Sequence, residues 1–335
     1  MRDYRIRTMV PGDLAAVAEL DLAAFDTAAA RAGHAPPEQR RHRMGLEYFR
    51  QKAPDLCLVA RAGSEVLGYL FGHRWGTTAW TGPIGVATEY MNHGIGTKLL
   101  VDFCQRAEVN EASIIGLETS IGHNVRLYER RGFKSRGLRL LTIKDLAAHP
   151  PRLRLRADGS GQAGEFRLVP WTALSADARK MRTAEIRRLG GLVAPGLDHT
   201  VEVAAVPEHK MGASYLALNS QDQVSGYAVV HLRSYRSADF NDAEPPLEPL
   251  VWVLVGWPEA AQALLSCCEA SVADAGANRL RLSCYSANPH AWVIAREVGY
   301  RLENAYVRLI YRGDYPGSAD RPWGGVPLDY SSWLG

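Results

Sequence analysis

The sequence has few of the features that mark membrane, secreted or nucleic-acid-binding proteins. It contains no apolar run of about 18 residues, and its beginning, MRDYRIRTMVPGDL, lacks the apolar stretch of a signal peptide. Its five cysteines lie in apolar runs without C-x-x-C spacing, which argues against a disulfide framework or a zinc site. The 39 basic and 36 acidic residues leave a net charge of only +3. We therefore expect a cytoplasmic monomer or homodimer that holds no metal and binds neither nucleic acid nor membrane.

The two common phosphate-binding loops are also missing. No Lys-Ser or Lys-Thr follows a G-x-x-x-x-G spacing, and the G-I-G at 94–96 lacks the third glycine of the dinucleotide fingerprint. Instead GPIGVATEYMNHGIG, at 82–96, leads into the helical pattern TKLLVDFCQRAEV. A strand, a glycine-rich turn and a helix N-terminus in this order favour an anion site, because free backbone N–H groups and the helix dipole attract negative charge. A plain tight turn is the alternative.

A second motif, NVRLYERRGF, follows at 124–133. Together the two motifs resemble the GNAT family of N-acetyltransferases, whose first motif ends R/Q-x-x-G-x-G/A and whose second has the form N-x-x-L-Y-x-x-x-G-F. One departure is Met91, which stands where the family usually has Arg or Gln. A side-chain contact to phosphate is therefore missing, and we expect the backbone cradle to bind the cofactor more weakly.

The resemblance implies the fold and the cosubstrate. It implies an α/β fold with a mixed, mostly antiparallel twisted sheet flanked by helices, in which one parallel strand pair splays apart at the acetyl-CoA site. A backbone N–H near Val86 is expected to polarise the thioester carbonyl. The residues that the resemblance assigns to acetyl-CoA are Ile84, Gly85, Val86, His93, Gly94, Ile95, Gly96, Thr97 and Asn124.

A length of 335 residues indicates two domains. A segment rich in Pro, Gly and charge, KDLAAHPPRLRLRADGSGQAG, ends at Gly164 and indicates a linker. Landmarks recur beyond it at a nearly constant offset, as when Gly299-Tyr300 repeats Gly132-Phe133. We therefore predict two tandem GNAT folds: a catalytic domain at 1–150, a linker at 151–164, a degenerate domain at 165–312 and a tail at 313–335 anchored by aromatic packing.

The second copy has lost the residues of the site. Glu259 and Ala261 stand where the first copy has Gly94 and Gly96, and Ala295 occupies the tyrosine position of the second motif. A carboxylate at this helix start would repel phosphate. We interpret the second copy as structural or substrate-shaping; two independently active halves are the alternative. Tandem copies also occur in mycothiol synthase, but its C-terminal copy is the working one, so the likeness is distant.

Tyr128 is the expected general acid, because a phenol with a pKa of about 10 can protonate a departing thiolate. A core tyrosine that packs the short helix against the sheet is the alternative. Asn124 is expected near the pantetheine arm, and a helix cap is its structural alternative.

The general base is less well marked. Glu118 lies at the end of the strand IIGLET, and alternation turns it away from Leu117 and Thr119, so it is our prediction for the base. The alternatives are Glu89, His73 and a chain of waters. The residues expected to line an acceptor pocket are Met91, Trp75, Trp80, Tyr48 and Phe49, together with the loop 27–39 that contains His34.

These features predict an acetyl-CoA-dependent N-acetyltransferase that acts on a primary amine of a small molecule. The competing hypothesis is a non-catalytic acyl-CoA sensor or interaction protein. Met91 and the poorly marked base favour the sensor, whereas Asn124 and Tyr128 favour the enzyme.

Overall fold

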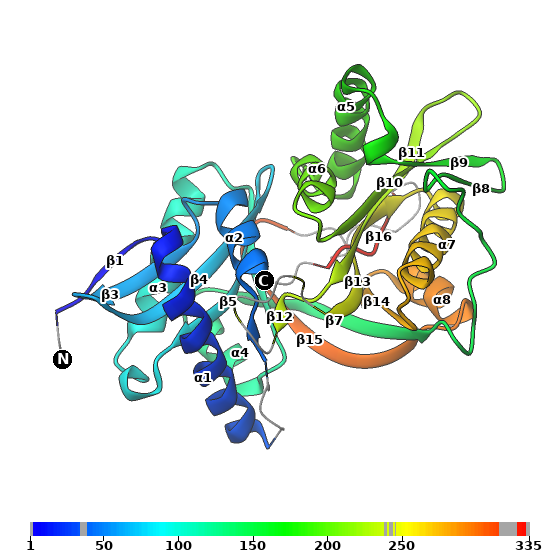
Figure 1. Cartoon of the computed structure of the whole chain (residues 1–335). Helices are drawn as coiled ribbons and strands as arrows, with labels where there is room; N and C mark the ends of the chain where they lie inside the picture. The colour runs from blue at the N-terminus through cyan, green and yellow to red at the C-terminus, as the bar shows by residue number, and fades with distance from the viewer. Residues whose placement is uncertain are drawn as a thin grey trace.

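A computed structural model describes residues 3–33, 39–237, 240, 244, 246–314 and 327–332. In the first half, the elements alternate between helices and mostly antiparallel strands (Figure 1). They are β1 Arg5–Thr8, α1 Leu14–Ala32, β2 Arg40–Arg41, α2 Arg43–Lys52, β3 Leu58–Ala62, β4 Glu65–Trp75, β5 Thr78–Val86, α3 Ile95–Val109, β6 Ile114–Thr119, α4 Gly122–Glu129 and β7 Lys134–Asp145, with short 3-10 turns at Pro11–Asp13 and Thr88–Tyr90.

The second half repeats this order of elements. They are β8 Gly161–Ala163, β9 Phe166–Pro170, a 3-10 turn at Trp171–Ala173, α5 Ala176–Val193, α6 Thr200–Glu208, β10 Gly212–Leu218, β11 Val224–Arg233, β12 Arg236–Ser237, β13 Leu247–Gly256, α7 Pro258–Asp274, β14 Arg279–Tyr285, α8 Pro289–Glu297, β15 Arg301–Arg312 and β16 Leu328–Asp329.

The two halves share one mixed sheet because each gives its last long strand to the other. The order of strands is β1-β3-β4-β5-β6-β15-β7-β14-β13-β11-β10-β9-β8, and β16 pairs with β13. Strand β15 of the second half lies between β6 and β7, and β7 of the first half pairs with β14 (Figure 1). The predicted α/β architecture with parallel pairs is confirmed. The exchange of strands adds that each half completes the sheet of the other.

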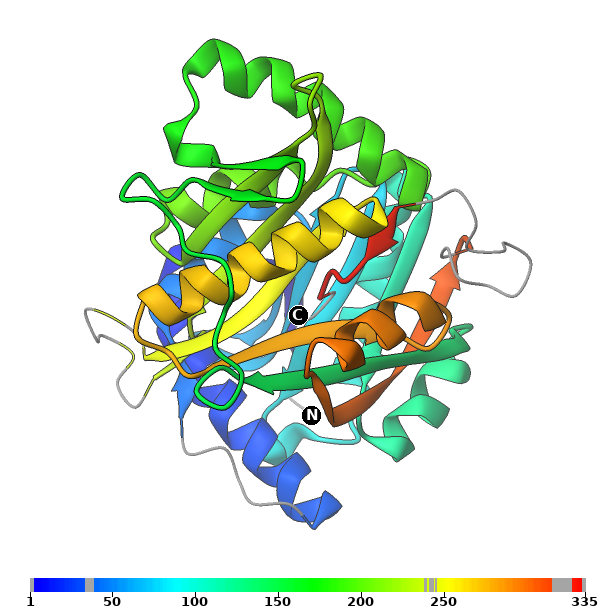
Figure 2. The ribbon, with the colours of Figure 1, turned by 90° about the vertical axis from the view of Figure 1, so that its right-hand side faces the viewer.

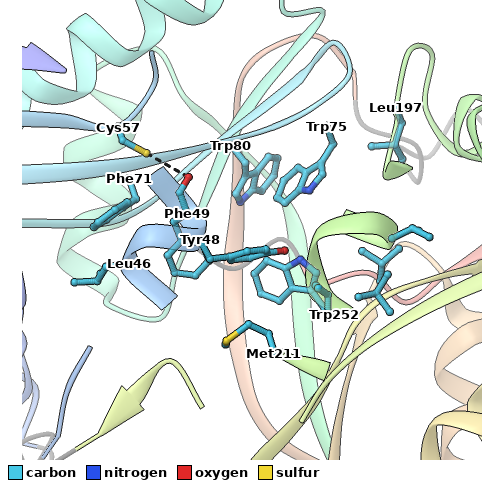
Figure 3. Packing of buried hydrophobic residues seen from close by; sticks show 14 of the residues in the cluster. Leu46, Tyr48, Phe49, Cys57, Phe71, Trp75, Trp80, Leu197, Met211 and Trp252 are labelled. Carbon is cyan, nitrogen blue, oxygen red and sulfur yellow. Dashed lines mark hydrogen bonds between the residues drawn. The ribbon is translucent and has the colours of Figure 1, made fainter. Parts of the chain in front are cut away.

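Helices cover both faces of the shared sheet (Figure 2). In the first half, side chains alternate between the two faces, so that Val59 and Tyr69 join the core under α1 and α2 while Leu58 and Leu70 join the core under α3. The first of these cores continues into the second half. Trp75 and Trp80 of the first half belong to the same core as Trp252 of the second half (Figure 3). The two halves are therefore joined through the sheet and also through a common apolar core.

Two sequence-based boundaries differ from the structure. Helix α1 does not end near Phe25 but continues to Ala32, because the segment TAAARA is rich in strong helix formers. Its extension covers residues 27–32 of the expected acceptor loop 27–39, and residues 34–38 of that loop lie outside the described residues. The predicted linker contains the short strand β8. The described part of the tail, 327–332, lies buried against β13, whereas Trp323 and Trp333 lie outside the described residues.

Within the described part of the chain, no helix is both long and apolar enough to cross a membrane.

Candidate active site

The predicted splayed strand pair lies between β5 and β6. These strands pair in parallel from Thr78–Thr81 to Ile114–Leu117, and the pairing stops there. Beyond it, the Ala87 N–H donates to the Leu67 carbonyl on β4 at 2.9 Å. Since backbone groups alternate in direction along a strand, the peptide groups of Ile84 and Val86 face the open side. This edge can hydrogen-bond an extended ligand such as a pantetheine arm.

A turn at the end of β5 presents the N-terminus of α3 to the same opening. Gly94 caps the helix with φ of +81°, a conformation that favours glycine. The N–H groups of Ile95, Gly96 and Thr97 belong to the first helical turn and have no intrahelical acceptor. A Cβ at Gly96 would meet only Val86 Cγ2 at 3.4 Å, so the glycine keeps the approach to these amides open. Free amides, a helix dipole and an uncovered backbone suit a pyrophosphate.

Helix α4 supplies the two side chains of the second motif. Asn124 is the third residue of the helix and not its cap, which is Ile121; in the second half, by contrast, Asn288 caps α8 by accepting from the Ala291 N–H at 3.0 Å. The position of Asn124 therefore leaves its side chain at the wall of the opening. Tyr128 lies four residues further on and is 6% exposed.

Burial alone raises the pKa of Tyr128 to about 12, since no charge or hydrogen bond from the described residues contributes. The hydroxyl is therefore a weaker acid than the unperturbed phenol that we expected from the sequence. At neutral pH this hydroxyl keeps its proton, and it is available as a hydrogen-bond donor. The ring packs against Phe133 at a centroid distance of 6.0 Å, which fixes its orientation.

These elements surround one cavity of about 1060 Å³. Of the residues assigned to the cofactor, all but His93 line it, as do Glu118, Tyr128 and Met91. His93 is exposed, and its Nδ1 lies 2.9 Å from the Met91 carbonyl, so its side chain turns away from the cavity. The opposite wall belongs to the second half, and its polar residues are His231, Arg233, Ser234, Tyr235, Arg236, Glu248, Arg281, Glu303, Asn304 and Tyr306.

Glu118 is buried between two guanidinium groups. Its Oε2 accepts from Arg139 Nε at 2.5 Å, and its Oε1 accepts from Arg308 Nη2 at 2.7 Å. Arg139 comes from β7 and Arg308 from β15, so the three residues join the exchanged strands at the cavity wall. Both carboxylate oxygens are therefore engaged by cations. This geometry argues for an electrostatic anchor and against the predicted general base.

Glu118→Gln is expected to lower the free energy of unfolding by about 3 kcal/mol, because it leaves two buried guanidinium groups without their anion. Urea unfolding measures the loss, and Arg74→Gln, which breaks the more exposed pair with Asp55, is the control with a small effect. A variant of unchanged stability whose acetyl-transfer rate is strongly reduced and loses its acidic pH limb would instead identify Glu118 as the base.

Most of the other residues expected at the acceptor pocket lie in the core. Trp75, Trp80, Tyr48 and Phe49 are all buried, and none of them lines the cavity; the same is true of His73, an alternative general base. Tyr48 and Trp75 donate hydrogen bonds to the buried Glu202 of the second half. Glu89 is exposed and also does not line the cavity. The prediction that these large side chains line the acceptor pocket was wrong, because they pack in the core that joins the two halves. The sequence does not show which aromatic residues pack between the halves.

Acid is expected to destabilise the protein through two buried histidines. Burial, assisted by the Lys52 charge at His73, lowers the pKa of His73 and of His231 to about 3. In the unfolded chain these groups bind protons below a pH of about 6.5, whereas in the folded chain they do so only near 3. The free energy of unfolding therefore falls as the pH drops from 6.5 towards 3, by about 3 kcal/mol between pH 6.5 and 5.

Urea unfolding at pH 7 and pH 5 measures this acid sensitivity. The variant His73→Gln removes one titrating group and is expected to reduce the difference in unfolding free energy by about 2 kcal/mol. An unchanged difference would contradict the assignment to these histidines.

The wall from the second half was not found from the sequence. The Tyr235 hydroxyl forms a hydrogen bond with His231, whose ring stacks on Trp252 at a centroid distance of 4.7 Å, while Glu248 and Glu303 both pair with Arg281. No local motif marks these residues, because they reach the cavity through the shared sheet. The only usable signal was the duplication itself, which implies a second sheet close to the first.

Comparison with known proteins agrees with this geometry. Residues 53–135 match the family model of the acetyltransferase (GNAT) domain, a segment that contains both motifs. This segment is therefore similar to the GNAT acetyltransferase domain. No curated protein matched the chain.

Solved structures resemble the whole chain. A provisionally assigned acetyltransferase from Pyrococcus horikoshii covers 100% of this chain and 96% of its own, with 15% identity and a TM-score of 0.65. A GCN5-related N-acetyltransferase from Sphaerobacter thermophilus covers 94% and 98%, with 15% identity and a TM-score of 0.58. A tandem GNAT protein from the clavulanic acid biosynthesis pathway covers 92% and 98%, with 16% identity and a TM-score of 0.56. At these identities the similarity establishes the tandem fold.

Proposed function

We propose that the protein is an acetyl-CoA-dependent N-acetyltransferase whose N-terminal unit, 1–150, transfers an acetyl group to a primary amine of a small molecule. One observation carries the proposal. The open edge of β5, the start of α3 with its free amides and Tyr128 line a single cavity. A cavity of about 1060 Å³ has room for a pantetheine arm and a small acceptor, and its second-half wall carries both signs of charge.

The residues present suit the cosubstrate. When bound, acetyl-CoA supplies an acetyl group as a thioester, with a thiolate as the leaving group. The amides of Ile95, Gly96 and Thr97 would hold the diphosphate, and an N–H on the open edge near Val86 would stabilise negative charge on the carbonyl oxygen. Tyr128, protonated at neutral pH, would donate a hydrogen bond to the sulfur as the carbon–sulfur bond breaks.

The amine loses its proton to solvent in this proposal. The carboxylates that line the cavity in the described residues are Glu118, Glu248 and Glu303, and each is paired with at least one arginine. We therefore assign none of these paired carboxylates as the general base. The attacking nitrogen must be neutral, so the rate is expected to rise with pH until the acceptor's own amine is deprotonated.

The second half, 165–312, acts in this proposal as the wall of the acceptor site, reached through the segment 151–164. Helix α7 begins with Pro258, which has no N–H, and carries Glu259 in its first turn. Ala295 is buried where α4 has Tyr128. These features support one cofactor site per chain.

A thiol-release assay with a panel of small amines tests the proposal. We expect amine-dependent release of CoA, with acetylated amine in equal amount by mass spectrometry, and one CoA per chain by calorimetry. Binding of CoA without release from any amine would favour the acyl-CoA sensor, which Met91 and the paired carboxylates support. Two CoA molecules per chain would contradict the assigned role of the second half.

A further inference from the structure

The second half contains a counterpart of the cofactor opening. Strands β13 and β14 run parallel but pair only at Leu250 and Arg281. At the end of β13 the Trp257 N–H donates to the Ser225 carbonyl at 3.1 Å, as Ala87 does to Leu67 in the first half. This correspondence makes Leu254–Gly256 the equivalent of Ile84–Val86, the edge that faces the pantetheine position.

The chain's own C-terminal segment lies on this edge. Strand β16 pairs antiparallel with β13, placing Asp329 opposite Val255 and Leu328 opposite Gly256 (Figure 1 and Figure 2). The Tyr330 N–H donates to the Leu254 carbonyl at 2.9 Å, and the Ser332 N–H donates to the Trp252 carbonyl at 2.6 Å. The segment thus makes the backbone hydrogen bonds that an extended ligand would make.

Side chains also hold the segment in the opening. Leu328 and Tyr330 are 4% and 1% exposed and belong to the apolar core that contains Ala261 and Leu264 of α7. The Tyr330 hydroxyl donates to the Ala291 carbonyl of α8 at 3.1 Å. Since α7 and α8 correspond to α3 and α4, this segment touches the same elements that surround the opening of the first half.

A short series of contacts connects the segment with the active-site wall. The Tyr285 hydroxyl donates to the Ser331 carbonyl, and the guanidinium of Arg308 lies 3.7 Å from the centroid of the Tyr285 ring. Arg308 in turn binds Glu118, which lines the cavity. The position of Glu118 is therefore tied, through two side chains, to the segment docked in the other half.

We propose that the splayed pair of the second half is a strand-binding groove whose resident ligand is the C-terminal segment 327–332, and that docking of this segment positions Arg308 and Glu118 for the first half. In this groove the backbone edge of β13 is still open to hydrogen bonding, but the group that binds to it is a peptide strand in place of a pantetheine arm. Main-chain hydrogen bonds to an open sheet edge are a known way to bind a peptide. The part of the proposal that concerns activity rests on the proposed function, whereas the docking part does not.

Hydrogen exchange in the full-length protein tests the docking. The amides of Tyr330 and Ser332 are expected to exchange as slowly as the amides of β13, because they form ladder hydrogen bonds in a buried groove. Rapid exchange of both amides would overturn the proposal.

A peptide in trans tests the groove as a binding site. A chain that ends at Gly325 should bind a synthetic peptide of residues 326–335, with a rise in Tm, and should not bind the same peptide carrying Leu328→Asp and Tyr330→Ala. If the truncated chain is folded by circular dichroism and binds both peptides equally or neither, the groove is refuted. If it does not fold, the exchange experiment decides the question.

The full-length variant Tyr285→Phe tests the positioning. It removes the hydroxyl that reaches Ser331 and keeps the ring under Arg308, and we expect kcat to fall roughly tenfold with little change in the KM for acetyl-CoA. The matched control is Tyr215→Phe, which removes a buried hydroxyl bonded to Ser271 away from this series. Equal kcat values for the two variants would overturn the positioning role. If the wild-type chain releases no CoA, only the proposed function fails, and the docking tests still apply.

Discussion

Tyr128→Phe is expected to lower kcat for amine acetylation by about 100-fold, which lies within the range for loss of a positioned proton donor. The hydroxyl reaches the cavity without a hydrogen bond to the described residues, so its removal leaves no buried partner unsatisfied. The ring remains and keeps its contact with Phe133. Stability and the Kd for CoA should therefore stay close to wild type. Steady-state thiol release and calorimetry measure the two effects separately.

Tyr311→Phe is the matched control for this experiment. Tyr311 packs against Phe133 from the other side, at a centroid distance of 5.3 Å, and does not line the cavity. Its variant should retain wild-type kcat. If Tyr128→Phe also retains it, the hydroxyl has only a packing role. If Tyr128→Phe instead loses CoA affinity with kcat unchanged, the hydroxyl contributes to cofactor binding and not to the transfer step.

The local part of the site was predictable from the sequence. The turn at Gly94, the start of α3 and the positions of Asn124 and Tyr128 on a short helix depend on residues within one or two turns of each other. Glycine at a positive φ and a run of apolar residues at helical spacing specify such structures without help from the rest of the chain. The splayed pair was expected from the resemblance to the GNAT family.

The non-local part was not predictable. Nothing in the composition of β7 or β15 shows that each pairs into the other half's sheet, because both are ordinary amphipathic strands. The exchange brings Arg139 and Arg308 to Glu118, which changes a free strand-end carboxylate into a buried anchor. Periodicity correctly turned Glu118 toward the opening between the strands. It could not show which cations would lie there.

The same distinction applies to the second half. Its loss of Gly94 and Gly96 equivalents is a local feature that the sequence shows, and α7 indeed begins with Pro258 and Glu259. That its opening is filled by 327–332 depends on a contact between segments far apart in the chain. The acceptor wall around Tyr235 and Arg281 is non-local in the same way, so its residues could be recognised only in the folded protein.

Gly96→Glu is expected to weaken CoA binding by at least about 100-fold. The new carboxylate would stand in the first turn of α3, where it would bind the free amides itself and repel the diphosphate. The side chain has room, because the nearest atom to a Cβ at this position is Val86 Cγ2 at 3.4 Å, and acidic residues stabilise a helix N-terminus. The free energy of unfolding should therefore remain the same or rise. Calorimetry with CoA and urea unfolding measure the two quantities.

Gly96→Gln separates charge from size, since its side chain has the same shape without the charge. We expect it to weaken CoA binding less than Gly96→Glu does, and the gap between the two variants should shrink as salt is added, because salt screens charge and leaves volume unchanged. Equal losses at all salt concentrations would mean that bulk alone blocks the cradle. Unchanged affinity in both variants would place the diphosphate away from α3. In that case nothing would hold the thioester between the open edge of β5 and Tyr128, and the proposed cofactor site would be wrong.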